Sequence, residues 1–132
     1  MKLTAMESQY SHNQELAYNI ISQLINACDL ILIWNKEIKS SDDYLTSPEG
    51  MGKMAASCMI IESIGESVKK LDRLLPGFLE GKAPYTPWKE IKGLRDHIAH
   101  GYFDIDASII YDVSVNEIPN LKKTFLKLQS SI

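Results

Sequence analysis

The residues with the greatest capacity for chemistry gather in one short stretch, from Trp88 to Tyr102. This stretch holds two of the three histidines and one of the two arginines in the chain. Histidine titrates near neutral pH and can take up or release a proton. Arginine carries a permanent charge and a fork of donors that fits phosphate oxygens. RNA cleavage without a metal needs such a set: a base for the ribose 2′-hydroxyl, an acid for the leaving 5′-oxygen and a cation for the phosphate.

Helical spacing sorts these residues by face. The apolar residues of the stretch predict a helix from about Pro87 to His100 or Tyr102; they are Trp88, Ile91, Leu94 and Ile98. At about 100° per residue, Arg95 lies at the border of this stripe and Tyr102 returns to nearly the same face. His100 lies about 140° from Arg95 and points away from the stripe, with Asp96 one turn before it.

One helix does not bring Arg95 and His100 tightly together. If two copies met through the outward face around Gly93 and His100, the dimer would gather two histidines and two arginines. The spacing alone also fits a solvated helix end with local ion pairs, in which Tyr102 makes a simple cap contact after Gly101.

A metal site is a weaker alternative. His97-x-x-His100 can place two ring nitrogens on adjacent helix turns, and Asp96, Asp104 and Asp106 lie nearby. These residues spread around the helix and no third ligand is fixed, so we expect no metal. His97 is then a surface residue or an auxiliary phosphate contact.

The order Arg95-x4-His100-x-Tyr102, with its flanks, resembles the HEPN superfamily and most closely its HepT-like toxins. The resemblance covers roughly Leu16 to Leu128. The matching flanks are Pro87-Trp88-x-x-Ile91-x-Gly93, Ile61-Glu62-x-x-Gly65-Glu66, and Ile105-Asp106 with Ile118-Pro119-x-Leu121.

The resemblance implies a dimeric helical bundle that acts as a metal-independent ribonuclease toxin without a cofactor. Arg95 and His100 of both subunits would line a shared cleft for RNA, and Asp96 matches the polar position after the motif arginine. The implied partner is an MntA-type minimal nucleotidyltransferase antitoxin that transfers AMP from ATP to Tyr102. This modification would add bulk and negative charge where an RNA phosphate would sit.

A second function stays open beside the toxin. Helical domains of this kind also accompany nucleotidyltransferases that modify small molecules. On that hypothesis the chain is a non-catalytic module that binds a nucleotidyltransferase or its substrate and cleaves no RNA.

The rest of the chain must position this stretch, and it reads as helices. We expect one helix from about Gln14 to Lys39 and a second from Pro48, capped by Ser47, to about Leu75. We further expect a helix over about 107–115, capped by a turn at Asp104-Ile105-Asp106, and a last one beyond a break at Asn116 and Pro119. The segment from Leu79 to Pro87 is expected to be a connection. The sequence therefore predicts one all-α domain, 1–132: an up-and-down four-helix bundle with a short additional C-terminal helix.

The first expected helix carries apolar residues on more than one face. Besides its main stripe it has a second set, Ile21, Ile25, Cys28 and Leu32. This set lies either deeper in the core or at a dimer interface.

Composition limits the remaining possibilities. The chain has 132 residues, 45% of them hydrophobic, and a net charge of −3, which argues against a protein that coats nucleic acid by bulk charge. Cys28 and Cys58 fit buried thiols in a reducing compartment. Met1 to Gln14 lacks the apolar core of a signal peptide, and the longest uninterrupted apolar run, Leu30 to Trp34, is short for a bilayer. We therefore expect a cytoplasmic protein.

Overall fold

The computed structural model describes residues 2–98 and 104–132. Within these ranges every regular element is helical, so the predicted all-α fold is confirmed. The elements are α1 (Lys2–Trp34), the 3₁₀ turn η1 (Ser41–Tyr44), α2 (Pro48–Leu74), α3 (Phe78–Lys82), α4 (Trp88–Lys92), α5 (Leu94–Ile98), α6 (Ala107–Asp112), the π-helical turn η2 (Val113–Glu117) and α7 (Ile118–Ser130).

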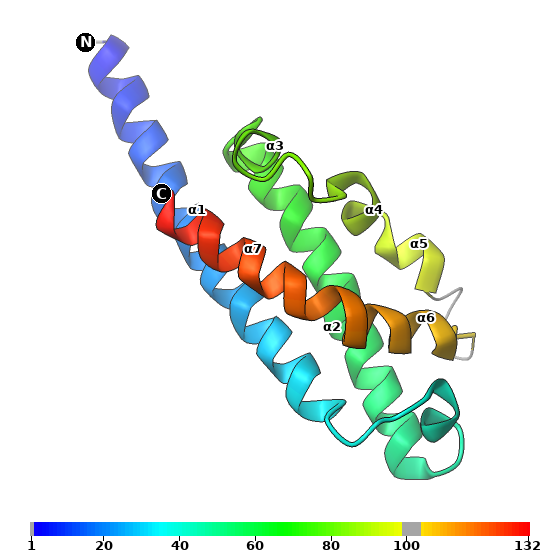
Figure 1. Cartoon of the computed structure of the whole chain (residues 1–132). Coiled ribbons are helices and arrows are strands. Elements are labelled where there is room, and N and C mark those ends of the chain that lie inside the picture. Colours follow the sequence, from blue (N-terminus) through cyan, green and yellow to red (C-terminus); the bar gives the residue numbers. More distant parts are fainter. Residues whose placement is uncertain (1, 99–103) are drawn as a thin grey trace.

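The helices form an up-and-down bundle (Figure 1). Helix α1 packs against both α2 and α7, and the short helices α4 and α5 lie on α2. The core between them holds large side chains without solvent exposure, among them Ile31, Ile61 and Phe125. Ile21 and Cys28 of the second apolar set are also buried, and Ile25 and Leu32 pack against the core. This set therefore belongs to the core.

Two predicted helix caps are present. The Ser47 hydroxyl accepts a hydrogen bond from the Gly50 amide at 3.0 Å, with Pro48 in the first turn of α2. The Asp106 carboxylate accepts from the Ile109 amide at 3.2 Å and so begins α6. Each cap satisfies a backbone donor that has no partner inside the helix.

Besides the end of α1, which lies at Trp34 rather than near Lys39, three boundaries differ from the expectation. Helix α1 begins at Lys2 rather than near Gln14, because residues such as Lys, Ala, Met and Glu favour a helix without an apolar stripe. Its first turns project beyond the bundle, with Met6 66% and Tyr10 57% exposed (Figure 1). The expected connection from Leu79 to Pro87 includes most of helix α3, whose Leu79 is buried.

The third difference concerns the C-terminal end. The expected break at Asn116 and Pro119 is replaced by η2, and α6, η2 and α7 follow one another without a non-helical residue. A π turn absorbs one extra residue in the helical register. Pro119 then falls in the first turn of α7, where a missing amide hydrogen costs little.

Helix α1 also bears on the question of a membrane. Over Thr4–Trp34 it is long and apolar enough, by length and composition alone, to cross a bilayer. Its buried face packs on α2 and α7, and core helices of soluble proteins meet the same criterion. The length and composition of α1 are therefore weak evidence for a membrane span.

Helix α4 lies close against α2. Gly65 is buried on α2, and a Cβ atom at this position would lie 2.9 Å from the backbone oxygen of Ile91. Trp88 and Ile91 of α4 are buried at this contact, and the Trp88 indole donates a hydrogen bond to the Ala83 carbonyl at 3.0 Å. The absence of a side chain at Gly65 therefore sets the distance between the two helices.

Two glycines of α2 provide a matched test of this contact. We expect Gly65→Ala to lower the free energy of unfolding by about 1–3 kcal/mol, because the new methyl group meets backbone that cannot rotate away. Gly52→Ala enters open space in the same helix and should raise the free energy of unfolding by up to about 1 kcal/mol. Urea denaturation measures both. Equal effects of the two substitutions would contradict the close approach.

Candidate functional site

The stretch with the candidate residues is two short helices rather than one. Helix α4 ends at Lys92, and α5 begins at Leu94. The amide of Gly93, between them, donates to the carbonyls of both Lys89 and Glu90, at 3.1 and 3.2 Å. The expected continuous helix is therefore wrong at this point. The predicted apolar stripe nevertheless holds, because Trp88, Ile91 and Ile98 are buried and Leu94 packs against the core.

Helix α5 presents Arg95 and Asp96 to solvent. Arg95 lines a groove of about 390 Å³ whose other lining residues all come from α2; they are Met59, Glu62, Ser63, Glu66 and Ser67. We call this the arginine groove. It combines one cationic side chain with two carboxylates and two hydroxyls, so its charged groups sum to a slight negative charge.

The charges around the arginine groove leave Arg95 accessible. Glu66 pairs with Lys69 of its own helix at 3.1 Å. Within the described part of the chain, Arg95 has no carboxylate at ion-pair distance. Its guanidinium donors therefore face solvent and the groove.

His100 and Tyr102 lie outside the described residues, as does the side chain of His97. The relations of His100 to Arg95 and to Asp96 therefore stay predictions. The described residues on either side of 99–103 are joined by a hydrogen bond, because the Asp106 amide donates to the Ile98 carbonyl at 3.0 Å. This bond ties the end of α5 to the start of α6.

An ion pair that no motif in the sequence indicates holds α4 against α2. Lys92, at the end of α4, pairs with Asp72 of α2 at 2.8 Å, and both side chains are partly buried. The pair fixes the end of α4 just before the turn that leads to Arg95. The two residues are 20 positions apart, on helices whose packing no local pattern predicts.

No group of three His, Cys, Asp or Glu side chains gathers within residues 4–96, 98 and 104–132. The metal set considered from the sequence includes His97 and His100, whose side chains fall outside that part. The finding therefore applies only to clusters built from the described side chains.

Cys58 is hydrogen-bonded to Glu62, one of the residues that line the arginine groove. Its Sγ donates to the Glu62 carboxylate at 3.8 Å. Burial, together with the charge of Glu62, raises the pKa of the Cys58 thiol from its ordinary 9.0 to about 11. Burial likewise raises the pKa of Cys28 to about 12. Both thiols are protonated at neutral pH, so neither is suited to act as a nucleophile.

This protonation state predicts slow thiol chemistry. In Cys28→Ala, which retains only Cys58, reaction with dithionitrobenzoate at pH 8 should be about a hundredfold slower in the folded protein than in guanidinium chloride, because about a hundredfold less thiolate is present. The folded-state rate should keep rising with pH to about 11. A rate that levels off near pH 9 would contradict the raised pKa.

An up-and-down helical bundle that carries the arginine of an Arg-x4-His-x-Tyr order at its surface defines a protein of the HEPN superfamily. A family model described as Ribonuclease HepT-like matches residues 24–128. The chain belongs to the HepT-like ribonuclease family.

Individual relatives agree with this assignment. "Putative RNase TTE0752" of Caldanaerobacter subterraneus is 33% identical over 78% of this chain and 85% of its own length. "Probable ribonuclease HepT" of Thermococcus cleftensis is 28% identical over 83% of this chain and 92% of its own length. "Putative RNase MJ1216" of Methanocaldococcus jannaschii is 39% identical over 54% of this chain and 56% of its own length. The chain spans about half the length of several such relatives. No solved structure matches it.

Proposed function

We propose that the chain is a metal-independent ribonuclease toxin whose catalytic residues are Arg95 and His100. The observation that carries the proposal is the exposure of Arg95. In the order of residues typical of the family, a histidine, here His100, follows this arginine in the sequence. A buried or ion-paired arginine would be a structural residue, whereas Arg95 has its donors available for a phosphate.

The roles follow from the chemistry of the side chains. One histidine takes the proton of the ribose 2′-hydroxyl, a second protonates the leaving 5′-oxygen, and arginine stabilises the charge on the phosphate. His100 follows Ile98, the last residue of α5, by two positions in the sequence. One chain supplies one such histidine, and a homodimer would supply the second. Asp96, four residues before His100 in the sequence, would support it.

The charges of the site predict how RNA would bind. Glu62 and Glu66 share the groove with Arg95, and the whole chain carries a net charge of −3. RNA contacts should therefore be few and local, and binding should weaken as salt rises, with a shallow slope because few phosphates are contacted. Any larger basic surface would have to come from a second copy.

RNA cleavage in the presence of EDTA tests the proposal. We expect the wild-type protein to cleave RNA, and Arg95→Ala to lose about 10²- to 10³-fold in rate because one phosphate-stabilising cation is removed. His100→Ala should lose about 10²- to 10⁴-fold. Gel analysis of labelled RNA measures the rates.

The other arginine provides the matched control. Arg73 is exposed on α2, away from the arginine groove, so Arg73→Ala should retain the wild-type rate. Both arginine variants should unfold within about 0.5 kcal/mol of the wild type, because both side chains are exposed. If the wild type left every RNA intact, or if both arginine variants lost activity equally, the proposal would fail. Binding to a nucleotidyltransferase without cleavage would then favour the non-catalytic module.

We further propose that the toxin is cytoplasmic and is neutralised by an MntA-type nucleotidyltransferase, which adds AMP to Tyr102. Tyr102 follows Arg95 by seven residues. An adenylyl group there would bring a negative charge and considerable bulk to the site, in competition with an RNA phosphate.

Mass spectrometry of the chain, incubated with such a nucleotidyltransferase, ATP and Mg²⁺, tests this regulation. We expect the mass of AMP on the peptide that contains Tyr102, together with loss of RNA cleavage. Tyr102→Phe should remain unmodified and active in the same mixture, because it lacks the acceptor hydroxyl. Adenylation at another tyrosine, such as the fully exposed Tyr85, would contradict the assignment.

A further inference from the structure

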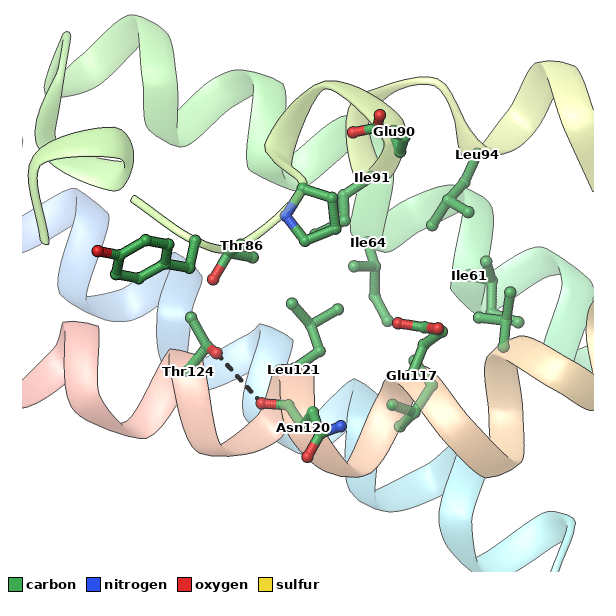
Figure 2. Close-up of a pocket in the computed structure, with 14 residues that line it drawn as sticks. Ile61, Ile64, Thr86, Glu90, Ile91, Leu94, Glu117, Asn120, Leu121 and Thr124 are labelled. Atoms are coloured by element: carbon green, nitrogen blue, oxygen red, sulfur yellow. Dashed lines mark hydrogen bonds between the residues drawn. The ribbon is translucent and has the colours of Figure 1, made fainter. Parts of the chain in front are cut away.

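A second and larger groove lies on the other side of α4 and α5. Its volume is about 530 Å³. Ile61 and Ile64 of α2 form its floor, α4 and α5 form one wall, and η2 with α7 forms the other (Figure 2). We call it the apolar groove.

The two grooves lie on opposite flanks of the contact between α2 and α4. Ile61 and Ile64 line the apolar groove, whereas Glu62 and Glu66 line the arginine groove. The average directions of these two pairs around α2 differ by roughly 150° at 3.6 residues per turn. The apolar groove is therefore separate from the site proposed for RNA.

The chemistry of the apolar groove selects its occupant. Its walls add further apolar side chains, including Ile91, Leu94 and Leu121, so most of its surface favours an apolar body. Its only charged lining residues among those described are Glu90 and Glu117, one on each wall. Figure 2 shows Glu117 reaching into the groove, with Glu90 standing on the α4 wall. An apolar floor with the Glu117 carboxylate beside it favours a cation and repels an anion.

The dimensions of the groove favour a small molecule. Pockets for small ligands commonly enclose about 300–1,000 Å³ and combine an apolar lining with a few polar groups. Thr86, Asn120 and Thr124 supply neutral polar groups along the same walls. The apolar groove meets each of these conditions.

We propose that the apolar groove binds a small organic cation, with its apolar body on Ile61 and Ile64 and its ammonium group near Glu117. The proposal does not depend on ribonuclease activity, because none of the residues assigned to catalysis lines this groove. It assigns a binding function to the face of the bundle that the proposed RNA site does not use.

Three probes on one ring system test the proposal: naphthylethylamine, naphthylethanol and naphthylacetate, which are cationic, neutral and anionic at pH 7. We expect the amine to bind saturably in calorimetry. The alcohol should bind about threefold to tenfold more weakly than the amine, because it lacks the attraction to a partly exposed carboxylate of the protein. Naphthylacetate should bind more weakly still. Amide NMR shifts should change at residues of the groove.

Variants then locate the site. Glu117→Gln should weaken the amine to nearly the affinity of the alcohol and leave the alcohol unchanged. Glu80→Gln, an exposed carboxylate on α3 outside the groove, should alter neither. Asn120→Trp places a large side chain from an exposed position over the groove and should weaken both probes.

Three outcomes would overturn the proposal. The first is equal affinity for all three probes. The second is an amine affinity that Glu117→Gln leaves unchanged. The third is the absence of saturable binding, as when a peptide or a second copy of the chain covers the groove. RNA cleavage is measured separately, so a failure of cation binding is distinguishable from a failure of the proposed ribonuclease.

Discussion

The contact between Gly65 and the backbone of Ile91 is the constraint on which the rest of the structure depends. Because α2 has no side chain at this position, α4 lies directly on it and buries Trp88 and Ile91. The ion pair of Lys92 with Asp72 holds the end of α4, and the turn at Gly93 then starts α5 with Arg95 at the surface. A helix held farther from α2 would place Arg95 away from Glu62 and Glu66.

This contact also explains why two unlike grooves flank one short segment. Leu94 lines the apolar groove and its neighbour Arg95 lines the arginine groove. The floor of each groove is a different face of α2, apolar on one side and polar on the other. The net charge of −3 therefore describes the surface poorly, because the position of each charged residue decides what each groove attracts.

Much of the fold follows from local patterns. The caps at Ser47 and Asp106 and the apolar stripe of Trp88, Ile91 and Ile98 were predictable, since they depend on residues within a few positions of one another. The turn at Gly93 was not predictable, because the apolar residues keep their helical spacing on both sides of it. The continuous run from α6 to α7 was missed because Asn116 and Pro119 usually end a helix, and only the π turn admits them.

The sequence by itself determined the all-α class, the identity of the core faces and the order of Arg95, His100 and Tyr102, because helical periodicity and motif spacing are properties of neighbouring residues. The tertiary structure alone decided what faces Arg95 and what lines the apolar groove. Glu66 precedes Arg95 by 29 positions, and Ile61 precedes Leu121 by 60. Partners so far apart meet only through the fit of packed helices, which depends on the shape of the whole core.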